Sequence, residues 1–284
     1  MQVLARLPIT FTGADGARVH APLVAGAVGG AVTRLVLDTG SDTHLLTREL
    51  ADRIGLHLAE GEEGVDHAGN RMPSWSAGTV PMRLAETDLE LRDTVVIPAP
   101  APFVASGISG IVSPQRLHPD AWTVIDLVDD ELLLVDGDVA SIAAWTSERH
   151  PELTLLALDQ ADDAGVVVIR AAIRPFAEMP VLVNTGGRHT EFDAVAVPAL
   201  VASASERIGG GVSGADVVGG FVTDQTLIVG GVELAVPRLA VRDGMHPPHG
   251  MVGMDVLPGS VVICAADRSR PVLWQVPVRQ SSPG

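Results

Sequence analysis

The 284-residue chain contains no lysine and no tyrosine, and Cys264 is its single cysteine. Without lysine there can be no P-loop lysine, no pyridoxal-phosphate Schiff base and no Ser-Lys dyad. The G-x-S-x-G motif of many serine hydrolases is missing as well. One cysteine excludes an internal disulfide bond, and the apolar setting of Cys264 indicates a buried structural thiol in a reducing compartment.

Long hydrophobic runs and basic charge are also scarce. Although 46% of the residues are hydrophobic, no apolar run reaches the roughly 20 residues that span a bilayer. The first residues lack a basic segment followed by an apolar stretch and a cleavage site, so we expect no secretion signal, no membrane partner and a cytoplasmic location. The net charge of −16 repels phosphate backbones, so we expect no nucleic-acid partner.

The chain does contain many short segments rich in Val and Leu and bounded by Gly, Pro or Asp, which is typical of an all-β protein. The expected strands are 3–11, 32–37, 80–84, 89–97, 122–125, 131–135, 166–172, 181–183, 226–229, 232–236 and 261–264. Helical signals are few. Thr47 caps a short helix that ends before Gly55, and a counterpart is expected from Asp193 to Ser203.

One motif occurs twice. Asp38-Thr39-Gly40-Ser41 follows the apolar run 34–37, and Asn184-Thr185-Gly186-Gly187 follows the run 179–183, 146 residues later. A glycine preceded by apolar residues then recurs at similar distances. Gly110 lies 72 residues after Asp38, and Gly253 lies 69 residues after Asn184. Two features that repeat in register indicate two duplicated lobes.

On these motifs the sequence resembles retropepsin-type aspartic peptidases, with two lobes fused in one chain. The segment 250–257, Gly-Met-Val-Gly-Met-Asp-Val-Leu, is close to the form found in bacterial members. The resemblance implies an all-β, bilobal acid-protease barrel fold of two pseudo-symmetric lobes with few short helices. We expect an N-terminal lobe at 1–140, an inter-lobe connection at 141–164 and a C-terminal lobe at 165–284.

Lobes of this type carry a β-hairpin flap that closes over the substrate. We expect the first flap at about 62–77, where Gly69-Asn70 suits a hairpin turn, and a second flap-like segment at about 205–222. Two flaps favour the retropepsin arrangement over the pepsin plan, which has one. The predicted substrate-binding residues are His67, Gly69, Trp75, Gly211 and Ser213, with Trp75 a loose substitute for the flap tyrosine of pepsins.

The resemblance also implies the chemistry. Two carboxyl groups that share one proton hold a water, one acting as base and the other as acid. Asp38 is the first candidate catalytic residue, and Asn184 stands where the second carboxyl group is expected. The other turn residues are expected to support them: Thr39 and Thr185 lock the turns together, Gly40 and Gly186 let backbone NH groups approach, and Ser41 hydrogen-bonds Asp38.

Asn184 cannot exchange a proton near neutral pH, so we expect this chain to be inactive or nearly so. Two explanations are open. One is an engineered Asp→Asn change that traps an inactive mutant form, which the otherwise intact second turn favours. The other is a natural pseudo-peptidase that binds peptides without cutting them. A third hypothesis is a β-rich structural protein in which both turns are merely packed.

The remaining candidates point to no cofactor and no metal. We expect His44 and His189 to be solvated loop residues, and His246 and His249 to lie in a Pro-rich loop because no third zinc ligand is visible. The acidic run 126–131 lacks the spacing of a calcium loop and is interpreted as a turn between strands. The expected partner is an extended peptide or precursor protein, bound by a monomer, with a dimer as the alternative.

Overall fold

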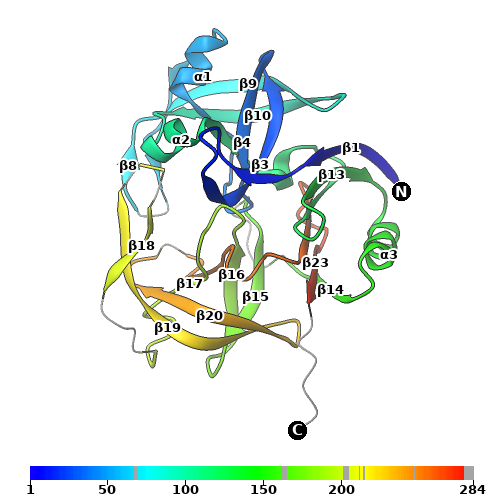
Figure 1. Cartoon of the computed structure of the whole chain (residues 1–284), viewed down its shortest axis with the longest axis vertical. Coiled ribbons are helices and arrows are strands. Elements are labelled where there is room, and N and C mark those ends of the chain that lie inside the picture. Colours follow the sequence, from blue (N-terminus) through cyan, green and yellow to red (C-terminus); the bar gives the residue numbers. More distant parts are fainter. Residues whose placement is uncertain are drawn as a thin grey trace.

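Two β-lobes and a sheet that joins them make up the fold (Figure 1). The computed structural model describes residues 1–66, 69–160, 165–200, 205–210, 212–213, 215–245 and 247–277. In Figure 1 the N-terminal lobe, in blue and cyan, lies above the C-terminal lobe, in yellow and orange. The predicted all-β, bilobal fold with few short helices is confirmed.

The N-terminal lobe is built on an eight-stranded sheet in the order β2-β3-β4-β11-β5-β10-β9-β6. A further pairing between β3 and β9 closes the sheet on itself, and the two-stranded hairpin β7–β8 extends from it. The elements are β2 Thr10–Thr12, β3 Arg18–Val28, β4 Ala31–Leu37, β5 Leu45–Thr47, α1 Arg48–Arg53, β6 Ala59–Glu60, β7 Gly64–Val65, β8 Arg71–Met72, β9 Trp75–Leu84, β10 Thr87–Ile97, α2 Ala101–Ser106 and β11 Ile108–Val112.

The C-terminal lobe repeats this plan in a seven-stranded sheet, β15-β16-β21-β17-β20-β19-β18. Its strands are β15 Val168–Ile173, β16 Met179–Val183, β17 Glu191–Asp193, β18 Glu206–Gly210, β19 Asp216–Val229, β20 Val232–Arg242 and β21 Gly250–Val252. In both lobes the strand before the repeated turn pairs in parallel with the strand that carries the glycine segment, β4 with β11 and β16 with β21. The duplication read from the motifs is therefore a duplication of strand pairing.

A six-stranded sheet, β1-β13-β12-β22-β23-β14, joins the two halves. Its strands are β1 Gln2–Pro8, β12 Trp122–Asp126, β13 Glu131–Asp136, β14 Leu153–Leu158, β22 Val261–Ala265 and β23 Val272–Pro277, and the 3-10 helix η1, Pro114–Arg116, precedes β12. The halves meet where β12 pairs with β22, from Trp122 opposite Ala265 to Asp126 opposite Val261. Since strands from both halves form this sheet, neither half completes it alone. Trp122 and Trp274 are fully buried in it.

The predicted inter-lobe connection contains more regular structure than a linker. It includes most of α3, Val139–Arg149, and all of β14. The Asp138 side chain caps α3 by accepting a hydrogen bond from Ser141 N at 2.7 Å, while Ile142 and Thr146 are buried beneath the helix. Neither the capping aspartate nor the buried stripe was recognised in the sequence.

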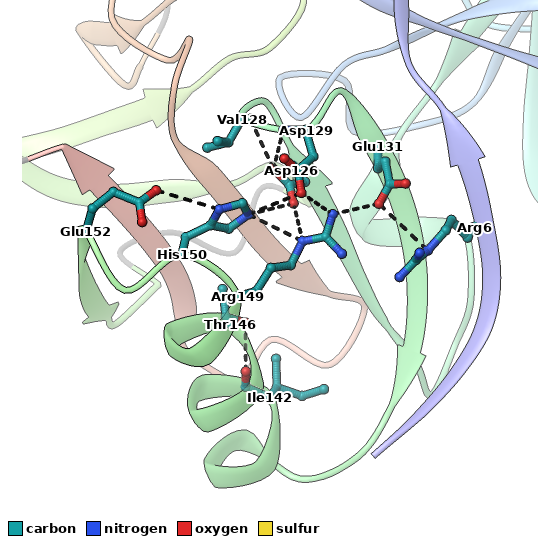
Figure 2. A network of polar contacts seen from close by, with 10 residues as sticks. All are labelled: Arg6, Asp126, Val128, Asp129, Glu131, Ile142, Thr146, Arg149, His150 and Glu152. Atoms are coloured by element: carbon teal, nitrogen blue, oxygen red, sulfur yellow. Dashed lines mark hydrogen bonds and ion pairs between the residues drawn. The ribbon is translucent and has the colours of Figure 1, made fainter.

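The end of α3 is fixed to the joining sheet by a network centred on Arg149 (Figure 2). Its guanidinium group contacts Asp126 at 2.9 Å, Asp129 at 2.5 Å and Glu131 at 2.7 Å. His150 Nε2 lies 2.9 Å from the same Asp126 carboxylate, which is fully buried. Because Arg149 neutralises buried negative charge, the acidic run 126–131 is a charge-paired turn between β12 and β13.

The helix predicted from Asp193 to Ser203 is wrong over the described residues 194–200, which form turns. The Asp193 carboxylate accepts a hydrogen bond from Val195 N at 3.0 Å, which holds a turn in place of the first helical hydrogen bonds. Pro198 has no NH group and cannot continue a helix at this position. The first predicted helix, by contrast, is α1, and Thr47 caps it through Leu50 N at 3.3 Å.

Candidate active site

Both repeated turns begin where a buried strand of their lobe ends. Asp38 follows β4, and its NH donates to Val112 O at 3.0 Å; Asn184 follows β16, and its NH donates to Val252 O at 2.9 Å. The crossing chains come so close that only glycine fits. A Cβ at Gly110 would lie 2.3 Å from Leu45 O, and one at Gly253 would lie 2.4 Å from His189 O. The repeated glycines are thus needed for strand packing beneath the turns.

The two threonines lock the turns together by reciprocal hydrogen bonds. Thr39 N donates to Thr185 Oγ1 at 3.1 Å, and Thr185 N donates to Thr39 Oγ1 at 3.1 Å. Each hydroxyl then donates across the interface, Thr39 to Val183 O at 2.5 Å and Thr185 to Leu37 O at 2.7 Å. Both threonines are fully buried, so these bonds hold the turns in one relative position.

Asp38 and Asn184 lie face to face above this lock. Gly40 N donates to Asp38 Oδ1 at 2.8 Å, and Gly186 N donates to Asn184 Oδ1 at 2.9 Å. A Cβ added to Gly40 would come within 2.8 Å of Asn184 Cγ, and one added to Gly186 within 2.4 Å of Asp38 Cγ. Each side chain therefore lies over the glycine of the opposite turn, and the two polar groups share one small space.

The fourth residue differs between the turns. Ser41 was expected to hydrogen-bond Asp38, but its hydroxyl donates to Thr43 O at 2.7 Å, within its own loop. Gly187 has no hydroxyl, and its NH donates to Asn184 Oδ1 at 2.9 Å. The Asn184 amide nitrogen faces the thioether of Met251, with Nδ2 and Sδ 3.4 Å apart. The two halves of the site are thus chemically unequal.

A cleft of about 1940 Å³ runs past the two turns and is lined by both lobes. Its volume exceeds the roughly 300–1,000 Å³ that is usual for a small-molecule pocket. Trp75 on β9 lines the cleft, and the guanidinium of Arg48 lies 4.8 Å from the centre of its ring. The size and the open walls of this cleft suit an elongated ligand.

Two hairpins meet at one side of this cleft. Figure 1 places β8 next to β18, where the hairpin β7–β8 of one lobe approaches the hairpin β18–β19 of the other. Asp66 accepts hydrogen bonds from Ser213, from the NH at 3.1 Å and from the hydroxyl group. The other Asp66 oxygen accepts from Asn70 N at 2.9 Å, and Asp66 is only 6% exposed. A buried carboxylate therefore joins the two hairpin tips.

Among the residues predicted to bind substrate, Ser213 lies at this junction and Gly69 lies in the first hairpin with a φ of +80°. His67 and Gly211 are outside the described residues. The role of Asp66 was missed, because its partner lies 147 positions away and nothing in either segment predicts the pairing.

His44 is fully buried, so the interpretation of this residue as a solvated loop histidine is wrong. Its Nδ1 accepts a hydrogen bond from Ser113 N at 3.2 Å. Burial lowers the pKa of His44 to about 4, since the charged imidazolium would lose its hydration. His44 therefore serves as a neutral hydrogen-bond acceptor beneath the first turn.

His20 is a cleft residue that sequence reasoning missed. It extends from β3 to the second turn, with Nε2 3.0 Å from Gly186 O. Desolvation is the main cause that lowers the pKa of His20, and the nearby charge of Arg188 lowers it further. Desolvation likewise lowers the pKa of His189, whose ring packs edge-on against Phe221 at 5.1 Å.

One group among the described residues has the composition of a metal site, namely Asp126, Asp129 and His150. The Arg149 guanidinium lies among these carboxylates (Figure 2) and already supplies the positive charge. Elsewhere, His249 Nδ1 lies 3.8 Å from Asp193 Oδ2, and His246 is outside the described residues. The residues at the cleft therefore offer acid–base groups, with no built cluster of metal ligands among those that the structure describes.

Comparisons with known proteins agree with this geometry. The family model for aspartyl proteases matches residues 24–112, which include the first turn and Gly110. The crystal structure of an aspartic proteinase from Irpex lacteus superposes with a TM-score of 0.54 and 12% identity, over 98% of this chain and 98% of that chain. No curated protein sequence matches. The chain thus has the fold of aspartic proteinases, as its motifs predicted.

Proposed function

We propose that this chain binds an extended peptide between its two lobes as an aspartic endopeptidase does, and that Asn184 leaves it inactive or nearly so. The observation that supports this most strongly is the pair of turns locked by Thr39 and Thr185, with Asp38 and Asn184 over each other's glycines. A buried lock of this kind positions two side chains within reach of one water. The cleft extends beyond the two turns, so a bound peptide has room on both sides of Asp38 and Asn184.

The peptide is expected to lie in an extended conformation. The hairpins β7–β8 and β18–β19 border the cleft, and a strand edge can offer backbone NH and C=O groups to an extended segment. Such contacts are independent of sequence, so they would fix the scissile bond above the turns. Side chains that line the cleft would then decide which peptides fit.

The chemistry requires one group that takes a proton from water and another that gives one to the peptide. Asp38, with Oδ1 held by Gly40 N, is suited to be the base. Asn184 can donate a hydrogen bond through Nδ2, but it cannot release a proton. With aspartate at position 184, two carboxyl groups would share the space above the lock, and their repulsion would keep one of them protonated.

The decisive experiment compares this chain with Asn184→Asp on a diverse peptide library, with products identified by mass spectrometry from about pH 4 to pH 8, where carboxylates and histidines titrate. We expect the variant to cleave at least about 100-fold faster, the usual minimum for restoring a general acid or base. Adding Asp38→Ala to the variant should abolish the cleavage. If a folded Asn184→Asp variant cleaves no peptide, the peptidase proposal fails.

A second candidate function is peptide binding without cleavage, with Asn184 as the natural residue. It is favoured by the surroundings of the amide, whose Oδ1 accepts two NH groups while Nδ2 faces the Met251 thioether. Gly187 also provides no hydroxyl for a carboxylate. This candidate predicts that peptides bind equally to both forms and are cut by neither, whereas a purely structural protein would bind none.

We further propose that the protein acts as a monomer in the cytoplasm on a specific precursor. One chain supplies both turns, which supports a monomer, and Cys264 is a buried thiol whose pKa is raised to about 12 by burial. No helix among the described residues is long and apolar enough to cross a membrane. Sedimentation measures the oligomeric state, and indiscriminate digestion of unfolded proteins by Asn184→Asp would contradict a dedicated substrate.

A further inference from the structure

The two halves of the cleft carry opposite charges at equivalent positions. The shift of 146 residues that relates Thr39 to Thr185 also relates Asp42 to Arg188, each four residues after Asp38 or Asn184. Both Asp42 and Arg188 are exposed, and both line the cleft. Because the turns are related by an approximate twofold axis, these charges lie on opposite sides of the candidate catalytic centre.

Near Arg188 the cleft is lined by a histidine and a second arginine. His20 contacts the second turn at Gly186, and Arg188 is near enough to act on the pKa of its imidazole. Arg18 precedes His20 by two residues on β3, so both side chains leave the same face of the strand, and both line the cleft. Two guanidinium groups thus border the cleft on this side.

These two arginines are available to a ligand. The other two arginines of the cleft have carboxylate partners, Arg207 with Asp216 at 2.7 Å and Arg242 with Glu191 at 3.0 Å. Among the described residues, no carboxylate lies within ion-pair distance of Arg18 or Arg188. In a chain with net charge −16, two unpaired arginines in the cleft favour an acidic ligand group.

The side of the cleft near Asp42 is different. Its neighbours across the lobe interface are Gly165, where an added Cβ would lie 3.5 Å from Asp42 Cβ, and the apolar Val166. Arg116 donates to the backbone carbonyl of Asp42 at 2.6 Å, and its guanidinium pairs with Asp93 at 2.7 Å. Within the described part of the chain, the Asp42 carboxylate forms no ion pair.

We propose that the cleft selects peptides with opposite charges on the two sides of the central residues, an acidic side chain bound by Arg188 and Arg18 and a basic one bound by Asp42. This inference rests on the proposed function and adds the class of substrate to it. Because the turns are nearly equivalent, the backbone alone would accept a peptide in either direction. Complementary charges at the two ends fix one direction and one register.

The test measures binding of labelled peptides to this chain, which is expected not to cut them, by fluorescence anisotropy. Four peptides share a neutral apolar centre and carry Lys and Glu, Lys and Lys, Glu and Glu, or Gln and Gln on its two sides. We expect the mixed Lys and Glu peptide to bind about tenfold tighter than each of the others, and added salt to reduce this preference.

Charge-reversal variants make the assignment specific. Reversing both arginines, Arg18→Asp together with Arg188→Asp, should move the preference to the Lys and Lys peptide, and Asp42→Arg should move it to the Glu and Glu peptide. Arg92→Asp reverses an exposed arginine on β10 that does not line the cleft, and should leave the preference for the mixed peptide unchanged. Circular dichroism checks that each variant is folded.

Two results would overturn the inference in distinguishable ways. Equal binding of all four peptides, or variants that leave the preference unchanged, would remove the charge selection and leave peptide binding intact. If the folded chain binds none of the four peptides, peptide binding itself fails, and the substrate class proposed here fails with it.

Discussion

At the scale of single residues, the candidate site depends on close approaches that only glycine allows. Gly186 is the clearest case, because a Cβ there would lie 2.4 Å from both Cγ and Oδ2 of Asp38. That distance is far below a van der Waals contact, so a methyl group must displace the carboxylate or separate the turns. The position of the Asp38 carboxylate therefore requires that residue 186 has no side chain.

Replacing Gly186 by Ala in the Asn184→Asp background should lower kcat/KM about 100-fold or more, since misplacement of a reacting group by about 1 Å has effects of this size. The matched control is Gly137→Ala, outside the cleft, where an added Cβ makes contacts no closer than 3.4 Å and φ is not positive. Steady-state kinetics on a cleaved peptide would make the comparison. Equal loss in both variants would contradict the steric explanation.

His44 predicts a dependence of stability on pH. Its pKa is about 4 in the folded protein and 6.5 when unperturbed, so between these values only the unfolded chain binds the proton. Stability is therefore retained above pH 6.5 and falls as the pH drops towards 4, with about 3 kcal/mol of unfolding free energy lost in total from this group.

Urea unfolding at pH 7.5 and pH 4.5 measures this loss. His44→Gln removes the group that titrates, so its stability should fall less between the two pH values. The exposed His57, replaced by Gln in the same way, should leave the pH dependence of the parent chain unchanged. An identical pH dependence in His44→Gln would contradict the role assigned to burial.

At the scale of elements, the contact between the two hairpin tips is the feature most open to test. Asp66 joins β7–β8 to the segment before β19 through Ser213, so loss of this carboxylate frees both hairpins. We expect Asp66→Ala to speed hydrogen exchange of the Asn70 amide and to raise the dissociation rate of a bound peptide about tenfold.

Ser213→Ala should give a smaller effect in the same direction, because Ser213 N can still donate to Asp66. The control is Ser147→Ala, an exposed position on α3 outside the cleft. Exchange followed by mass spectrometry and stopped-flow dissociation provide the two measurements. If Asp66→Ala changes neither the hydrogen-exchange rate of the Asn70 amide nor the dissociation rate of the peptide, the hairpin contact does not control ligand exchange.

The elements also show how far sequence reasoning reached. Motifs that depend on local chemistry were found, among them the strands before the turns and the helix capped by Thr47. Contacts between distant segments, such as Asp66 with Ser213 and His20 with Gly186, were not predicted. Periodicity describes one element at a time, whereas these contacts depend on how two lobes are placed.

Misassignments had equally physical causes. His44 follows the polar residues Ser41, Asp42 and Thr43, yet it is fully buried, with its carbonyl accepting from Val95 N at 2.9 Å. The expected helix after Asp193 failed because a short-range hydrogen bond from Asp193 competes with the helical pattern. In each case tertiary or side-chain contacts outweighed a weak local preference.

At the scale of the whole molecule, the joining sheet couples the folding of the lobes. Strands β1, β12 and β13 precede α3, while β14, β22 and β23 follow it, and the pairing of β12 with β22 lies in the middle. Each half alone would leave the buried sheet edge and Trp122 or Trp274 exposed to water. We therefore expect one cooperative unfolding transition.

Denaturant unfolding followed by far-ultraviolet circular dichroism and by tryptophan fluorescence tests this expectation. The tryptophans report on both regions, Trp75 on the N-terminal lobe and Trp122 and Trp274 on the joining sheet. The two probes should give coincident midpoints. Residues 1–140 expressed alone should show no cooperative transition, whereas two separate transitions in the full chain would indicate independent lobes.

The fusion of two lobes in one chain has a consequence for heredity. A site assembled from two copies of the same subunit receives every mutation twice, so its halves must stay identical. Here each turn is encoded separately. The reciprocal threonine bonds keep the two turns aligned even when the residues next to the threonines differ between the lobes. Gly187 opposite Ser41 and Arg188 opposite Asp42 are differences that a homodimer could never carry on one side only.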